Sequence, residues 1–168
     1  MAEVGFAAGY LPLPAHLQVG EALDVFARLY AVADPASAVA AGLARFGVAH
    51  LAGKLATDLS SGQRTLVGIV KAILHHPRLL VLDEPTASLD PDVARRVREG
   101  LERVCAEDGT ALLVTSHNMT DVERVCERVV FLSAGRVVAD GPPAEVAARF
   151  GRATLEEVFV HLAGEEAG

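Results

Sequence analysis

The sequence predicts an α/β fold in which a helical first half leads into a mainly parallel sheet flanked by helices. Between residues 19 and 75, apolar residues recur at the three- and four-residue spacing of amphipathic helices. From residue 77 onward, short uninterrupted apolar runs alternate with helical patterns, which is typical of parallel strands covered on both faces. A glycine-containing turn near residue 135 predicts an antiparallel extension of the sheet.

The first half is expected to be entirely helical after an irregular start. Residues 1–16 are rich in Gly, Ala and Pro, which interrupt regular structure. Asp34-Pro35 ends the first helical pattern, and Gly47 ends the second because glycine readily takes the left-handed conformation of a helix C-terminus. The predicted helices run over 19–32, over 37–46, and from the Ser60-Ser61-Gly62 segment to about residue 75.

The second half is expected to alternate strands with helices. Asp90-Pro91 is a typical helix start, with an N-cap followed by proline at the first helical position. Thr120 and Glu123 have the spacing of a capping box. The predicted elements are strands at 79–82 and 111–115, a helix from 91 to about 105, a helix beginning near 120, a hairpin of 129–132 and 136–139, and helices at 142–150 and 155–162.

Composition and charge exclude several classes of protein. The 168 residues, 51% of them hydrophobic, suffice for one domain with a buried core. No apolar run approaches the roughly 18 residues of a membrane-spanning helix, and the N-terminus lacks the basic cluster of a secretory signal. A net charge of −7 without a basic stripe argues against a general nucleic-acid binder. Cys105 and Cys126 match no zinc-site spacing, so we expect core thiols in an intracellular protein.

The strand predicted at 79–82 ends in Asp83-Glu84-Pro85. In open α/β sheets, ligands bind outside the carboxyl ends of the strands. Two adjacent acids at that edge can divide two tasks, one holding Mg²⁺ and the other orienting or deprotonating an attacking water. An ordinary surface turn is the alternative, because so short a motif also occurs by chance.

Three further segments carry polar groups where a phosphate ligand could use them. Ser60-Ser61-Gly62-Gln63 opens a helix, whose N–H groups and dipole favour anions, although a plain N-cap is the alternative. His117 follows the strand at 111–115 and is expected on the same sheet edge as Glu84. Ser88-Leu89-Asp90 lies between the acids and the next helix, which Asp90 caps in either interpretation.

In their order and spacing, these segments together resemble the ATP-binding cassette (ABC) ATPases. Leu59 to Gln63 is similar to the signature motif of that family, Leu79 to Glu84 to its Walker B strand, Ser88 to Asp90 to its D-loop, and His117 to its switch histidine. The ending Leu155-Glu156-Glu157-Val158-Phe159 is similar to exporter-type subunits. The resemblance extends from about Gly9 to the C-terminus and implies an incomplete P-loop NTPase-like fold.

The resemblance implies a role for each matching residue. Asp83 would position Mg²⁺, Glu84 would polarise the attacking water, and His117 would contact the γ-phosphate of ATP. Asp90 would link the two sites of a cassette dimer. The cofactor-binding segment would comprise Ser60, Ser61, Gly62 and Gln63, with Ser60 and Gly62 holding the γ-phosphate of an ATP bound mainly by the opposing subunit. A separate transmembrane permease would attach the subunit to the cytoplasmic face of the membrane.

One motif of the family is missing. A Walker A loop, G-x-x-x-x-G-K-[ST], cradles phosphates with its backbone and its lysine. The chain has only Lys54 and Lys71: Leu55 occupies the hydroxyl position after Lys54, and Val70 precedes Lys71. The metal-sensing glutamine or glutamate expected after Gly9-Tyr10-Leu11-Pro12 is also absent. We therefore expect the C-terminal portion of a cassette, with weak ATP binding and negligible hydrolysis on its own.

The resemblance also divides the chain into four expected parts. These are an irregular Q-loop-like segment (1–16), a helical signature subdomain (17–76), an α/β core (77–141) and C-terminal helices (142–168).

Four hypotheses for the function follow. The leading one is an ATP-binding subunit that couples ATP hydrolysis to export, together with a second cassette and a permease. A second is a non-catalytic partner that donates Ser60 and Gly62 to a complete cassette. A third is the C-terminal lobe of a DNA-repair ABC-type ATPase, although the sequence shows neither a long heptad helix before the signature nor a basic surface. The last is a truncated reading frame without an independent role.

Overall fold

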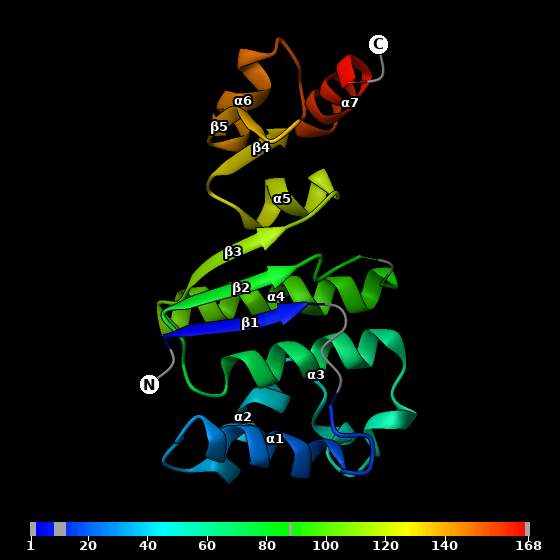
Figure 1. The fold of residues 1–168 in the computed structure, drawn as a ribbon, viewed down its shortest axis with the longest axis vertical. Coiled ribbons are helices and arrows are strands. Elements are labelled where there is room, and N and C mark those ends of the chain that lie inside the picture. Colours follow the sequence, from blue (N-terminus) through cyan, green and yellow to red (C-terminus); the bar gives the residue numbers. More distant parts are fainter. Residues whose placement is uncertain (1–2, 9–12, 88, 167–168) are drawn as a thin grey trace. The chain divides into compact units, whose positions relative to one another are not determined.

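The chain forms two units, as seen in a computed structural model that describes residues 3–8, 13–87 and 89–166 (Figure 1). The first unit runs from Met1 to Thr115 and the second from Ser116 to Gly168. Each unit has its own cluster of buried apolar side chains. Within the described residues, no helix combines the length and the apolar character needed to cross a membrane. The four-part division expected from the sequence stays a prediction.

The first unit contains a parallel sheet with the strand order β1-β2-β3. β2 (Leu79–Asp83) and β3 (Ala111–Thr115) confirm the strands predicted from the uninterrupted apolar runs. Pairing in register places Asp83 directly beside Thr115 on β3 and beside Ala8 on β1. The carboxyl ends of all three strands therefore lie along one edge of the sheet.

β1 (Val4–Ala8) shows that two expectations were wrong, because residues 1–16 are not wholly irregular and the first half is not entirely helical. It pairs in parallel with β2 over its whole length. Gly5 allows β1 to lie close to the backbone at Ala72, since a Cβ at residue 5 would stand 2.2 Å from the Ala72 backbone oxygen. Gly5 thus weakens the strand signal in the sequence and, in the fold, allows the close packing of β1. The Q-loop-like segment Gly9–Pro12 lies outside the described residues.

The three helices predicted for the first half are present. They are α1 (Val19–Leu29), α2 (Pro35–Arg45) and α3 (Ser61–Ile73), with short 3-10 turns at Ala49–Leu51 and Ala56–Asp58 between α2 and α3. Asp34 caps α2 by accepting a hydrogen bond from the Ser37 N–H at 3.1 Å. Gly47 follows α2 with a φ of +67°, as its predicted role as a helix stop requires.

The long helix α4 (Pro91–Asp108) begins after Asp90 as predicted and extends beyond its predicted end near Cys105. Its last residue, Asp108, accepts hydrogen bonds from the guanidinium of Arg45 on α2. Gly100 lets α4 approach the helical part closely, because a Cβ there would lie 2.2 Å from the Phe46 ring. The ion pair and this contact hold α4 against the C-terminal end of α2.

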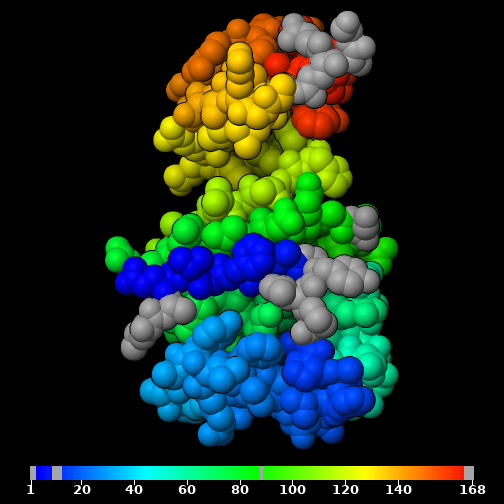
Figure 2. Space-filling view, in the orientation of Figure 1, coloured from blue at the N-terminus to red at the C-terminus, as the bar shows by residue number. Residues whose placement is uncertain are grey.

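The two faces of the sheet in the first unit differ in their cover. Leu80 and Leu82 are fully buried in a cluster with apolar side chains of α3 and α4. Val4, Phe6 and Leu113, at alternate positions, are 50%, 49% and 56% exposed. The expectation that the strands are covered on both faces is therefore wrong for the face that carries these three residues, which we call the uncovered face. Figure 2 shows β1 in blue at the surface.

The second unit is built from a hairpin and three helices. The elements are α5 (Met119–Val125), β4 (Val129–Ser133), β5 (Arg136–Gly141), α6 (Pro143–Arg149) and α7 (Leu155–Glu166). The antiparallel pairing of β4 with β5 confirms the predicted hairpin, but among the described residues these strands form a sheet of their own, so the expected extension of the parallel sheet was wrong. The capping box predicted at Thr120 and Glu123 was wrong: Asn118 caps α5, and Glu123 instead accepts a hydrogen bond from the Leu155 N–H at 2.6 Å.

Because the two sheet faces differ in burial, a leucine-to-alanine substitution should lower the free energy of unfolding by different amounts on each face. Leu80→Ala should lower the free energy of unfolding by about 2–5 kcal/mol, because it empties a fully buried site. Leu113→Ala, the matched control on the uncovered face, should cost less than about 1 kcal/mol. Urea denaturation measures both values, and equal costs would show that the two faces are equally covered.

Candidate functional site

The carboxyl ends of β2 and β3 are joined by the side chain of Thr115. Its Oγ1 donates a hydrogen bond to Asp83 Oδ1 at 2.5 Å. The Glu84 N–H lies 3.1 Å from the Thr115 carbonyl oxygen and 3.2 Å from Thr115 Oγ1. Thr115 therefore holds both acids of the Asp83-Glu84 pair at the sheet edge. Sequence reasoning missed this role, although pairing the two predicted strands in register would have placed Thr115 beside Asp83.

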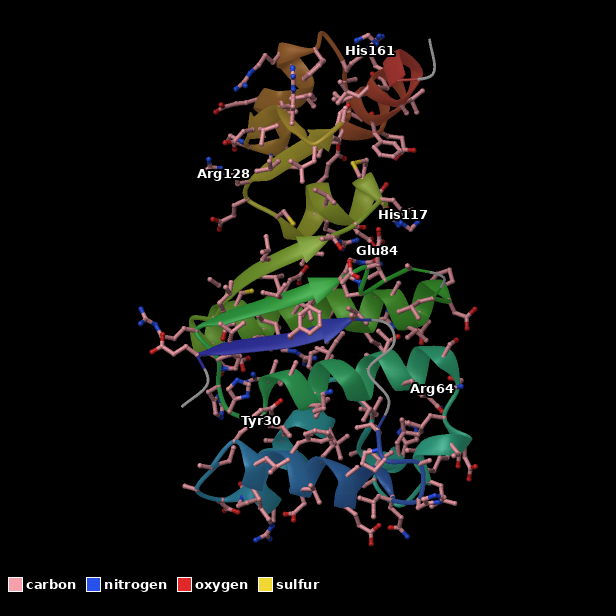
Figure 3. All side chains as sticks on the ribbon, in the orientation of Figure 1. Tyr30, Arg64, Glu84, His117, Arg128 and His161 are labelled. Carbon is pink, nitrogen blue, oxygen red and sulfur yellow. The ribbon has the colours of Figure 1, made fainter. Side chains whose placement is uncertain are left out.

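Glu84 has a backbone conformation that is uncommon for a residue with a side chain. Its φ is +49°, in the left-handed region. Such a conformation costs of order 1–3 kcal/mol and persists only where surrounding contacts hold it, often at functional sites. Here the contacts with Thr115 hold it. Figure 3 shows Glu84 just beyond the end of β2.

A pocket of about 580 Å³ in the first unit opens beside these acids. Asp83 and Glu84 line it on the sheet side, together with apolar residues from the ends of β1 and β2. Ser61, Arg64 and Thr65 line it from the first turns of α3, the helix that carries the signature-like segment (Figure 3). The fold thus brings part of the signature-like segment and the acidic pair to one pocket, although Ser61 and Asp83 are 22 positions apart in the sequence.

The start of α3 is a complete capping box. Ser60 Oγ accepts a hydrogen bond from the Gln63 N–H at 3.2 Å, and Gln63 Oε1 accepts one from the Ser60 N–H at 3.1 Å. The N-cap predicted at Ser60 is therefore confirmed, with Gln63 as its reciprocal partner. Ser60 is exposed and its hydroxyl hydrogen can still donate to a ligand.

Gly62 is buried against the start of α4. A Cβ at this position would lie 3.1 Å from a methyl group of Val93 and 3.6 Å from one of Leu89. The absence of a side chain at Gly62 thus serves packing between α3 and α4, in addition to any approach of a ligand to the backbone. Through this contact, the signature-like segment touches the residues that flank Asp90.

Asp90 is not among the residues that line the pocket of the first unit. Asp90 is the exposed N-cap of α4, without a side-chain capping hydrogen bond. In the first turn of that helix, a hydrogen bond from Arg95 lowers the pKa of the Asp92 carboxyl. His117 is exposed and belongs to the second unit. Ser88, the first residue of the D-loop-like segment, lies outside the described residues.

The donor set suits a magnesium ion that is shared with phosphate and water. No group of three or more His, Cys, Asp or Glu side chains in the described residues could hold a metal by itself. Mg²⁺ commonly uses one or two carboxylates and completes its shell with water and phosphate oxygens. Asp83, exposed and oriented by Thr115, fits that requirement.

Neither lysine lies among the described residues of the pocket lining. Lys71 is 7% exposed in α3, with its Nζ 4.9 Å from the centroid of the Phe26 ring. Burial lowers the pKa of Lys71. Its environment is that of a packed core residue rather than a phosphate ligand.

Sequence comparisons relate the chain to ATP-binding proteins of ABC transporters. It is 40% identical over 124 residues to the phosphonates import ATP-binding protein PhnC 1 of Rhodopseudomonas palustris (strain HaA2), covering 74% of this chain and 41% of that protein. It is 37% identical over 125 residues to the methionine import ATP-binding protein MetN of Caulobacter vibrioides, covering 74% and 34%. The chain thus matches less than half of either relative. Residues 49–120 match the family described as "AAA domain, putative AbiEii toxin, Type IV TA system".

Solved structures show the same fold. An ATP-binding subunit of an ABC transporter superposes with a TM-score of 0.78 at 29% identity, covering 95% of this chain and 68% of that one. CbiO1 of Clostridium perfringens, part of the ABC transporter complex cbiONQ, superposes with a TM-score of 0.74 at 28% identity, covering 88% and 60%. The fold is that of the ABC ATPases, and the chain is a relative of ABC transporter ATP-binding proteins, as its motifs predict.

The prediction of an exporter-type subunit has no support in these relatives, which are named as import proteins. Leu155 and Val158, two of the five residues on which that prediction rested, are fully buried in the core of the second unit. Packing of α7 is therefore one reason for apolar side chains at these two positions.

The hydrogen bonds of Thr115 can be tested by removing its hydroxyl group. Thr115→Val keeps the shape but leaves Asp83 without its donor and the Glu84 N–H with one acceptor fewer. We expect a loss of about 1–3 kcal/mol in the free energy of unfolding, and faster hydrogen exchange at the Glu84 amide. Thr115→Ser retains the hydroxyl and should lose less than half as much. If the two variants are equally stable, the hydroxyl does not hold the acids.

Proposed function

We propose that this chain acts as the ATP-binding part of an ABC transporter and that it contributes its Walker B acids to one ATP site of a cassette dimer and its signature segment to the other. The observation that carries the proposal is the arrangement at the sheet edge, where Thr115 orients Asp83 and holds Glu84 at a positive φ. With both acids held in place, Asp83 is suited to bind a metal ion and Glu84 to activate a water molecule.

In this proposal, each site residue has a distinct task. Asp83 holds Mg²⁺ together with water and phosphate oxygens. Glu84 orients and polarises the attacking water, for which its place just beyond β2 is suited. His117 contacts the γ-phosphate, and Asp90 links the two ATP sites of a dimer. Bound Mg²⁺ would offset the charge that develops on the phosphate oxygens.

The signature segment would act on an ATP molecule held mainly by another cassette. Ser60 can donate its hydroxyl hydrogen while its oxygen caps α3, and the N–H groups near Ser61 and Gly62 lie at the positive end of the helix dipole. Gln63 fixes this geometry from within the helix through its bond to the Ser60 N–H. In the proposed assembly, this segment faces an ATP molecule whose phosphates are held by the phosphate loop of the second cassette.

The proposal extends to the partners of the chain. A second cassette and a membrane-embedded permease are expected, and the chain would bind at the cytoplasmic side of the membrane. The names of the relatives favour import over export. No basic surface that would favour a nucleic-acid partner is apparent from the sequence, which has a net charge of −7.

Assembly with a complete cassette tests the proposal. The 168-residue chain is mixed with a purified ABC ATP-binding protein that carries a Walker A loop, and complex formation is measured with and without ATP and Mg²⁺. We expect a complex that forms only with both, while the chain alone hydrolyses ATP negligibly. Ser60→Arg should weaken the complex at least about tenfold, because the larger cation blocks the start of α3.

The matched control is Ser37→Arg, the same change at an exposed position in the first turn of α2. This variant should assemble like the unaltered chain. Melting curves establish that both variants fold. The proposal is contradicted if no ATP-dependent complex forms, or if the chain alone turns over ATP rapidly and Glu84→Gln abolishes that turnover.

A further inference from the structure

The first turns of α3 and α4 pack against each other in the first unit. The two helices begin at the same end of the unit and run in the same direction (Figure 1). A Cβ at residue 62 would lie 3.1 Å from Cγ1 of Val93, 3.6 Å from its Cγ2, and 3.6 Å from a methyl group of Leu89. Val93 and Leu89 are half-buried and pack against the core cluster of the unit. The start of α3 thus lies directly against side chains at the start of α4.

The backbone of α3 does not require glycine at residue 62. Its φ lies outside the left-handed region, and alanine is favoured over glycine within a helix. The glycine therefore provides room, either for a ligand at the helix start or for Val93. Carbon atoms in optimal contact are about 3.5–4.0 Å apart, so a Cβ at 3.1 Å from Val93 would have to displace that side chain or the helix. Val93 needs this room whether or not a ligand binds.

One backbone hydrogen bond closes the first turn of each helix. In α3, the Arg64 N–H donates to the Ser60 carbonyl at 2.9 Å. In α4, the Ala94 N–H donates to the Asp90 carbonyl, also at 2.9 Å. Val93 lies within the turn that Asp90 opens. The contact at Val93 therefore joins two turns whose N-caps, Ser60 and Asp90, are both exposed.

We propose that Val93 is a positioning residue, which fixes the start of α3 relative to the start of α4 and so holds the signature-like segment and Asp90 in one arrangement. This inference rests on the proposed function, in which the signature segment faces the ATP of the second cassette and Asp90 links the two ATP sites. Both then meet the second cassette together. Ordering two separate segments during assembly would cost affinity, which a fixed contact between them avoids. Val93 acts through Gly62 and has no contact with ATP in this proposal.

Complementary changes of size at residues 62 and 93 test the contact in the 168-residue chain alone. Gly62→Ala should force the two turns apart and speed hydrogen exchange of both the Arg64 and the Ala94 amides about threefold or more. An effect confined to α3 would change only the Arg64 amide. Adding Val93→Ala removes the two methyl groups next to the new Cβ, so the double variant should return both rates to within about twofold of the unaltered chain.

Gly53→Ala is the matched control, because none of the described residues beyond its chain neighbours lies within 4 Å of the added Cβ. It should leave both amides unchanged, and circular dichroism establishes which variants fold. The proposal is overturned if Gly62→Ala leaves the Ala94 amide unchanged, or if the double variant exchanges as fast as Gly62→Ala alone. Where Gly62→Ala alone does not fold, recovery of the fold in the double variant supports the proposal, and its absence contradicts it.

Assembly with a complete cassette separates this inference from the proposed function. With ATP and Mg²⁺, Gly62→Ala should weaken the complex about fivefold or more, and the double variant should recover most of that loss. A double variant that exchanges like the unaltered chain but binds as weakly as Gly62→Ala would overturn the positioning role, since the added methyl group then obstructs the ligand. If even the unaltered chain forms no ATP-dependent complex, the proposed function fails, and the exchange rates alone decide whether Val93 fixes the two turns.

Discussion

The parallel pairing of β2 with β1 on one side and with β3 on the other is the constraint on which the first unit depends. It aligns the last residues of three strands, so that Asp83 lies beside Thr115 and Glu84 turns off at the same edge. The hydroxyl of Thr115 can then orient one acid and bind the backbone of the next. A shift of β3 by one residue would turn Thr115 to the opposite face and remove both interactions. The candidate site is therefore a consequence of strand register.

Much of this arrangement could be predicted from the sequence because its signals are local. The uninterrupted apolar runs gave β2 and β3 correctly, and Ser60 is the N-cap expected at the start of α3. β1 could not be predicted, because glycine and alanine, at three of its five positions, have low strand propensity, and because its position depends on contact between Gly5 and the backbone of Ala72, which is distant in sequence. The part played by Thr115 was missed for a similar reason, since it exists only once two strands are paired.

Two sequence features that resemble family motifs also have a packing role in the folded protein. Gly62 resembles a phosphate-binding glycine, yet its lack of a side chain also accommodates Val93 and Leu89. Leu155 and Val158 belong to a segment that resembles the ending of one kind of transporter subunit, yet both are also fully buried in the core of the second unit. A motif can therefore be required by packing alone, and its chemical role follows only from the groups that remain available to a ligand. At the sheet edge, the exposed carboxylate of Asp83 is such a group.

The most direct test of the central claim is paramagnetic broadening by Mn²⁺ in the presence of ATP and a complete cassette. If the sheet edge holds the metal–nucleotide complex, the amide signals of Asp83, Glu84 and Thr115 should broaden first, and Asp83→Asn should abolish the effect. Broadening centred on the acidic first turn of α4, around Asp92, would contradict the claim. Broadening at the sheet edge that persists in Asp83→Asn would contradict it as well.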